Sequence, residues 1–398
     1  MSRPHSVSNI NFLRYTVLQC MAVMTGLSGN EIYCLKQKGY VPGDLVIGNS
    51  VFSMGFIGSI GSGLKTLAGG EVQQVTTMIH EGREASFQRM MGEANQRGGS
   101  GITGVTNELI MQSGNIEFLS VGSCLHRDDG QAEQLQFSSS ADGQELYCQM
   151  DCGFHPSHFV FGNVAYSIGV GGGLGGALRS LSRGEVVEYS NVFNQTRHLA
   201  LQRISQDAMR YGANAVVGIE TSIIPFQGMQ EMVMIGTAAT HPALGPEFNN
   251  NPVTSDLTNQ EMWNLISMGY MPLRLILGVS VYSLGVAGGI SAMLKGLSKG
   301  EIPELSTLIY EAREKAIDKV KEQATQVGAD DVVGLKSYVY QLGGGLIEFM
   351  VVGTAVKKMA GLKTNSPMMI AQAIIADKDT FANTAEVAIG TNLNEQKR

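Results

Sequence analysis

The apolar and polar positions of the chain follow one pattern that occurs three times. The copies begin LVIGNSVFSMG, FVFGNVAYSIG and LILGVSVYSLG, and they stay in register without a gap over residues 45–104, 159–218 and 275–334. Self-similarity of this kind indicates one folding unit used three times. The architecture can therefore be predicted from the unit, whereas no catalytic constellation recurs with it.

Within the unit, the apolar spacing predicts a strand, a long helix and two further strands. The opening residues 45–52 are β-branched and apolar, which favours a strand. A glycine-rich segment follows, and then a helix whose apolar residues recur at helical spacing. Small residues in that stripe indicate close packing against a sheet. In the first and third copies the stripe consists of Val75, Met78, Ile79, Gly82, Ser86, Met90 and Ala94, and of Leu305, Leu308, Ile309, Ala312, Ala316, Val320 and Ala324.

A short helix is predicted before each copy, because a capping-box sequence stands there: Ser28-Gly-Asn-Glu31, Asp142-Gly-Gln-Glu145 or Thr258-Asn-Gln-Glu261. The predicted fold is therefore α+β. It consists of three tandem small three-layer domains (strand, helices, two strands), each preceded by a short capped helix. The predicted boundaries are 1–27 for an N-terminal extension, 28–125, 142–239 and 258–357 for the repeats, and 358–398 for a C-terminal tail.

Composition and charge exclude several classes of function. The 398 residues carry a net charge of −7, with 28 Lys and Arg against 35 Asp and Glu. No nucleic-acid partner is expected, because such a protein would show clustered basic residues. Five cysteines are an odd number at low density, which favours a reducing, cytoplasmic location. Arg3 and Arg14 before the mildly apolar residues 15–27 imitate a signal peptide, but the late position of that run weakens the interpretation.

The later part of each copy resembles a known family. In the third copy the residues concerned are Ala312-Arg-Glu-Lys-Ala316, Gly328-Ala-Asp-Asp-Val-Val-Gly334 and Val352-Gly-Thr-Ala-Val356. The second copy has Gly212-Ala-Asn-Ala-Val-Val-Gly218, whereas the first departs with Gly98-Gly-Ser-Gly-Ile-Thr-Gly104. These motifs resemble the YbjQ-like family, described as a heavy-metal-binding domain. The resemblance implies a dodecin-like topology and single-domain members that form five-membered rings. No metal-ligand motif transfers with it residue by residue.

Each copy also contains twenty residues without a charge, at 45–64, 159–178 and 275–294. Such a run is long enough to span a bilayer as a helix. Its first half alternates like a strand, however, so burial against another repeat or along the axis of a ring is favoured over membrane contact. Residues 58–66 look like a phosphate-binding loop, but Leu64 separates the last glycine from Lys65, and no nucleotide site is expected.

Residue types that suit a metal ion gather at one place. Cys148, Cys152, His155 and His158 supply two thiolates and two imidazoles, a ligand set for zinc or a similar divalent metal. The other copies lack this set. A cysteine in the capped helix is equally explained as a small buried apolar residue. This metal site is the only cofactor hypothesis that the sequence provides.

A glutamate and an arginine recur in every copy. A glutamate at the start of a helix complements the helix dipole, which is a sufficient structural role. The arginine lies twelve residues further on, more than three turns away, so it does not meet its own glutamate on a straight helix. A contact between repeats or subunits is the alternative role. The predicted assembly contacts are Glu71, Arg83, Glu185, Arg197, Glu301 and Arg313.

The sequence therefore predicts a non-enzymatic protein that oligomerises with itself into a ring or tube and has a scaffold or binding role. In the favoured arrangement five chains stack their repeats in three five-fold rings, which makes a pentamer. Alternatively, the repeats share one ring, and two chains form a dimer with six positions. Binding of a metal ion or small ligand is the alternative function. A membrane-associated assembly through the glycine-rich segments is the third.

Overall fold

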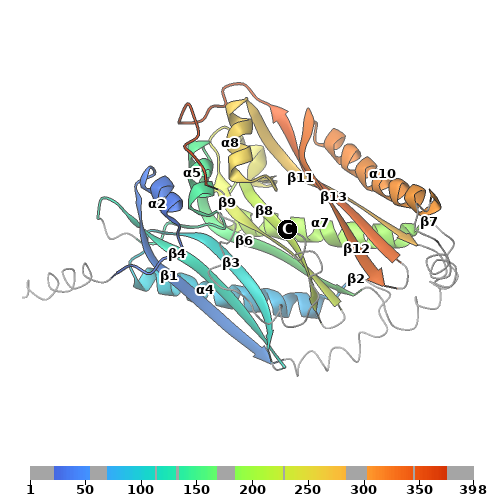
Figure 1. Ribbon diagram of the computed structural model, residues 1–398, viewed down its shortest axis with the longest axis horizontal. Helices are drawn as coiled ribbons and strands as arrows, with labels where there is room; N and C mark the ends of the chain where they lie inside the picture. The colour runs from blue at the N-terminus through green and yellow to red at the C-terminus, as the bar shows by residue number, and fades with distance from the viewer. Residues whose placement is uncertain are drawn as a thin grey trace, which may run out of the picture.

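The three predicted units are present in the computed structural model, which describes residues 22–53, 70–112, 114–130, 134–167, 184–226, 229–283, 303–343 and 346–373. Figure 1 shows that each unit combines a short helix, a long helix and a sheet. The α+β architecture repeated three times is thereby confirmed. The predictions for residues 58–66, for the glycine-rich segments and for Glu301 fall outside the described residues.

In the first unit, a four-stranded sheet carries one long helix. α2 (Gly29–Lys36) leads into β1 (Tyr40–Ser53), and α4 (Gln73–Gln96) leads into the hairpin of β3 (Gly101–Gln112) and β4 (Asn115–Arg127). The order in the sheet is β1-β4-β3-β5, and its three long strands are antiparallel. β5 (Phe137–Ser138) belongs to the linker and pairs in parallel with β3.

The other two units repeat this order of elements. The second unit comprises α5 (Gly143–Asp151), β6 (His155–Ser167), β7 (Gly184–Glu185), α7 (Val187–Arg210), β8 (Ala215–Phe226) and β9 (Met229–Thr240), followed by η2 (Pro246–Asn249) and β10 (Val253–Thr254). The third unit comprises α8 (Asn259–Ser267), β11 (Tyr270–Ser283), α10 (Pro303–Gln326), β12 (Asp331–Gly343) and β13 (Leu346–Lys358).

The long helices lie close to their sheets because glycine stands at the crossing point of the first strand. A Cβ atom added at Gly48 would overlap the carbonyl oxygen of Ser86 in α4, and one at Gly162 would overlap that of Ala200 in α7. The helix offers small residues at the same place. The predicted stripe of the first long helix, from Val75 to Ala94, is buried throughout. The inference of close packing against a flat sheet is thus confirmed.

Each of the first two units extends a strand into the sheet of the next unit. β2 (Gly70–Glu71) pairs antiparallel with β6, and β7 pairs in the same way with β11. α4 and α7 consequently pack against two sheets, their own and that of the following unit. The expectation that Glu71 starts the long helix is wrong: the helix begins at Gln73, and Glu71 belongs to the added strand.

The short helices α2, α5 and α8 lie side by side at one end of the molecule (Figure 1). α2 and α8 have complete capping boxes, built on Ser28 and Thr258. At α5 the Asp142 side chain accepts hydrogen bonds from backbone N–H groups, but no capping box forms.

The C-terminal segment packs beside these helices. Residues 367–373, in the described part of the predicted C-terminal tail, are irregular. Met369 and Ile370 still pack against a buried apolar cluster. The Gln144 side chain accepts a hydrogen bond from the Ala373 N–H at 2.6 Å and donates one to its carbonyl at 3.1 Å, which links the segment to α5.

Candidate functional site: the junctions between repeats

The first junction is centred on a buried ion pair between Arg83 of α4 and Glu231 of β9. The guanidinium donates to both carboxylate oxygens, from Nη2 at 2.7 Å and from Nε at 3.0 Å. Its Nη1 donates to the backbone and side-chain oxygens of Asn107, at 2.6 and 2.9 Å. Arg83 and Glu231 have no exposed surface. The bidentate geometry is the strongest form of such a pair and fixes the position of α4 on the second sheet.

The second junction repeats this arrangement with Arg197 of α7 and Glu348 of β13. The distances are 2.7 Å from Nη2 and 3.0 Å from Nε, and both residues are fully buried. Nη2 also donates to the hydroxyl of Tyr166 at 2.7 Å. Burial disfavours the charged form of Arg197, but the charge of Glu348, the Tyr166 hydroxyl and the hydrogen bonds to both together outweigh this effect, and the net result is a raised pKa.

Main-chain contacts accompany each ion pair. In the first junction the Ala165 N–H donates to the Thr76 hydroxyl at 2.9 Å, and the Val72 N–H donates to the Ala165 carbonyl at 2.8 Å. In the second, the Val281 N–H donates to the Ser190 hydroxyl and the Val186 N–H donates to the Val281 carbonyl, both at 2.8 Å. The same set of contacts in both places means that the two junctions are copies of one interface.

The recurrent glutamates form a second, more exposed set of contacts across the junctions. Glu71 pairs with Arg203 of α7 at 2.7 Å, and Glu185 lies 4.0 Å from the ammonium of Lys319 of α10. Each glutamate belongs to the short strand, β2 or β7, that is added to the next sheet, and from there it contacts the long helix of the following repeat. The structure brings four of the six predicted contact residues into ion pairs between repeats: Glu71, Arg83, Glu185 and Arg197.

The two remaining residues of that set belong to the third repeat. Glu301 lies outside the described residues. Arg313 is exposed on α10 and forms no ion pair with any residue in the described ranges. Within the described ranges, the third repeat therefore has no ion pair on α10 equivalent to those of Arg83 and Arg197.

The glutamates that pair with the recurrent arginines are not among the residues predicted from the sequence. Glu117, Glu231 and Glu348 stand at one aligned position, five residues before a shared glycine in the last strand of each repeat. A charged residue that recurs in an otherwise apolar strand is the signal that identifies them, because such a group is buried only when it is paired. The distance along the chain, 148 residues in the first junction, conceals the pairing.

The four candidate metal ligands do not form one site. Cys148 and Cys152 are buried in an apolar cluster, and burial raises the pKa of the Cys148 thiol to about 12. His158 stacks on Tyr211 with ring centroids 3.7 Å apart, and burial lowers its pKa to about 4. His155 is exposed. Across the described ranges, no three His, Cys, Asp or Glu side chains are grouped so that they could hold a metal ion.

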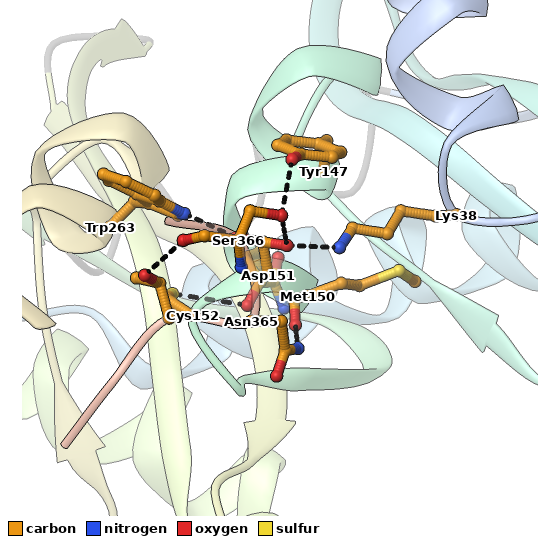
Figure 2. Close-up of polar contacts among 10 residues, drawn as sticks. Lys38, Tyr147, Met150, Asp151, Cys152, Trp263, Asn365 and Ser366 are labelled. Atoms are coloured by element: carbon orange, nitrogen blue, oxygen red, sulfur yellow. Dashed lines mark hydrogen bonds and ion pairs between the residues drawn. The ribbon is translucent and has the colours of Figure 1, made fainter. Parts of the chain in front are cut away.

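A second polar centre lies where all three repeats meet the C-terminal segment (Figure 2). The buried carboxylate of Asp151 in α5 accepts hydrogen bonds from Lys38 at 2.7 Å and from the Trp263 indole at 2.8 Å. The Ser366 hydroxyl donates to it at 2.8 Å. Burial by itself raises the pKa of Asp151, but these hydrogen bonds and the charge of Lys38 lower it overall. Asp151 thus fastens repeats one and three and the C-terminal segment to repeat two.

None of the helices within the described ranges combines the length and the apolar character needed to cross a bilayer. The described first halves of the uncharged runs are the strands β1, β6 and β11.

An α+β unit used three times, with a buried Arg–Glu pair at each described junction, defines a pseudo-symmetric tandem-repeat protein. The chain belongs to the family whose model is described as "Putative heavy-metal-binding" (YbjQ_1). That model matches residues 36–122, 155–241 and 270–359, most of the chain. The resemblance found in the sequence motifs is confirmed.

Relatives share one or more of these units. The chain is 32% identical over 227 residues to a protein of Mycobacterium tuberculosis called "Encapsulin nanocompartment protein Rv1762c", a match that covers 54% of this chain and 83% of that protein. It is 43% identical over 84 residues to a "UPF0145 protein" of Methanocella arvoryzae, covering 21% of this chain and 69% of the relative. A "UPF0145 protein" of Methanoregula boonei is 34% identical over 99 residues, covering 23% and 82%.

Proposed function

We propose that this protein is a non-enzymatic scaffold that assembles with copies of itself, with its repeats in successive positions of one ring. The observation that carries the proposal is the repetition of one buried interface, Arg83 with Glu231 and Arg197 with Glu348. A heterologous interface of this kind, used twice in succession, generates a ring when the rotation between neighbouring repeats closes. The relative named as a nanocompartment protein supports a role in assembly.

The ring that we propose differs from the stacked arrangement favoured by the sequence. Three stacked five-fold rings would bring identical repeats of five chains side by side. In the described chain it is different repeats of one chain that lie side by side, because β2 pairs with β6 and β7 with β11. This favours the alternative, in which two chains supply six positions of one ring. A pentamer of three-repeat chains would need fifteen positions.

Native mass spectrometry of the purified full chain tests this function. We expect the principal species to have twice the mass of the 42.6 kDa chain. A monomer at every concentration up to about 50 μM would contradict the scaffold proposal. A pentamer would retain self-assembly and overturn the six-position ring.

Metal binding stays the alternative function, and the described residues give it no ligand set. Metal analysis of the same preparation after dialysis checks it. Zinc retained at one equivalent per chain would favour the alternative, and Cys148→Ala would then show whether this cysteine contributes.

A further inference from the structure

The helix half of the junction occurs a third time on α10, where nothing covers it within the described chain. The aligned residues of α4 are Thr76, Ile79, Arg83 and Phe87, and all four are buried. So are their counterparts in α7, Ser190, Phe193, Arg197 and Leu201. On α10 the aligned residues are Ser306, Ile309, Arg313 and Ile317. The first and third of these are exposed and the other two are half-buried. We call these four residues the open helix face.

The sheet half of the junction also occurs a third time, on the first repeat. In β6 the residues that meet α4 are Phe161, Asn163 and Ala165, none more than 2% exposed. Leu277, Val279 and Val281 of β11 are fully buried in the same way. Their counterparts in β1 are Ile47, Asn49 and Val51. Ile47 is 38% and Val51 61% exposed, and Asn49 is also exposed.

The glutamate of the junction is present on this surface as well. Glu117 of β4 aligns with Glu231 and Glu348, yet it is half-buried where they are fully buried. Its carboxylate accepts a hydrogen bond from the Asn49 side chain at 3.3 Å. We call Ile47, Asn49, Val51 and Glu117 the open sheet face. Large apolar residues in an exposed strand beside a half-buried carboxylate are typical of a surface that binds a partner.

We propose that the open helix face of one copy of this chain binds the open sheet face of a second copy, with Arg313 paired to Glu117. The inference rests on the proposed assembly function and specifies its contact. Two observations identify a second copy of this chain as the partner that covers each open face. The faces carry opposite charges at the position where each internal junction has an Arg–Glu pair. They also continue an interface that the chain already forms twice.

The two faces belong to opposite ends of the described chain and do not meet within it, because both remain exposed. Their contact therefore joins two molecules. When two copies contact each other reciprocally, each supplies one helix face and one sheet face, and all open faces are covered. The pair Arg313–Glu117 would then be buried like its two counterparts.

Charge reversal tests the contact. We expect Arg313→Glu and Glu117→Arg each to raise the dissociation constant of the complex about a hundredfold, because each places like charges at the contact. An equimolar mixture of the two variants should restore the complex, since one contact then has the reversed pair and the other has the natural pair. The double variant R313E/E117R should assemble with itself. Light scattering at 1–50 μM measures all four samples.

The matched control is Lys315→Glu. It makes the same change of charge on the same helix, but two residues on, about 200° around the helix axis from Arg313. We expect it to leave the dissociation constant unchanged, and circular dichroism should show native helix content in every variant. An oligomeric wild type with unaffected variants would overturn this contact and leave the proposed function standing. A monomeric wild type would overturn both.

Discussion

Arg83 and Glu231 lie 148 positions apart and in different repeats, yet their side chains form two hydrogen bonds at 2.7 and 3.0 Å without exposure to solvent. A buried pair of this kind gains little net stability over well-packed apolar residues, because both charges are taken out of water. It is nevertheless highly sensitive to the loss of one partner. The pair therefore determines which surfaces can meet, more than it adds to the total free energy of folding.

Removing the arginine should show this asymmetry. We expect Arg83→Ala to lower the free energy of unfolding by about 3–5 kcal/mol, since it leaves the Glu231 carboxylate buried and unpaired. The double variant R83M/E231L should recover most of that loss. Urea denaturation followed by circular dichroism measures both. A loss of less than about 1 kcal/mol for the single variant would show that the carboxylate reaches water by another route.

Glu145 should make the protein less stable as pH rises towards neutrality. Burial, with repulsion from Glu220, Glu261 and Glu31, raises its pKa to about 7. In the unfolded chain a glutamate titrates near pH 4.3. A raised pKa means that the folded state holds the proton more tightly, so the contribution is present below about pH 4.3 and lost as pH rises to about 7.

Glu145→Gln should remove this dependence. We expect the variant to be about 1–2 kcal/mol more stable than the wild type at pH 8 and equal to it at pH 4. Urea denaturation at a series of pH values gives the difference. The control is Glu188→Gln, an exposed residue of α7. Equal stability of E145Q and wild type at pH 8 would contradict the raised pKa.

Asp151 should show the opposite dependence on pH. Its lowered pKa means that its contribution is complete above about pH 4, the value for the unfolded chain, and is lost as pH falls through the folded value. We expect Asp151→Asn to cost about 2–3 kcal/mol at pH 7, because the Lys38 ammonium and the Trp263 indole lose a charged acceptor. The difference from wild type should shrink in acid.

Limited proteolysis provides a second check on Asp151. The Ser366 hydroxyl and N–H both donate to its carboxylate. D151N should therefore increase cleavage within residues 359–373 relative to cleavage in the repeats. An unchanged cleavage pattern would mean that the apolar contacts of Met369 and Ile370 alone hold the segment.

Two glycines should respond to alanine with opposite signs. At Gly162 a Cβ atom would overlap the Ala200 carbonyl oxygen, so α7 must move away from the sheet, and we expect Gly162→Ala to cost about 3 kcal/mol. Gly92 lies within α4 with open space around it, and Gly92→Ala should add about 0.5–1 kcal/mol through helix propensity. Thermal unfolding of both variants separates the effects. Destabilisation by G92A would contradict this account.

Sequence reasoning was reliable where the structure depends on one repeat alone. The stripe from Val75 to Ala94 predicted both the long helix and its buried face, and the Ser28 and Thr258 caps were identified from four residues each. Contacts between repeats could not be predicted in the same way, because no local periodicity encodes them. Glu71 illustrates this: its position before a helix suggested a dipole role, whereas it belongs to a strand added to another sheet.

The same limit explains the outcome for the candidate site. Arg83 and Arg197 were singled out as contacts, but their glutamate partners depend on how the repeats are stacked. Comparison of the aligned positions 117, 231 and 348 would have revealed those partners. The four candidate metal ligands do not converge on one point, and the reason is local. Cys148 lies on the core side of a short amphipathic helix, where an apolar side chain is needed.

Fusion of the repeats into one chain has allowed the two junctions to diverge. In a ring of identical subunits, a single substitution alters every interface at once. Here Arg83 finds its additional acceptors on Asn107, whereas Arg197 uses the hydroxyl of Tyr166. The position of Tyr166 is held by Phe52 in the first repeat. Each junction thus has its own contacts around the arginine, and a substitution can change the strength of one junction without changing the other.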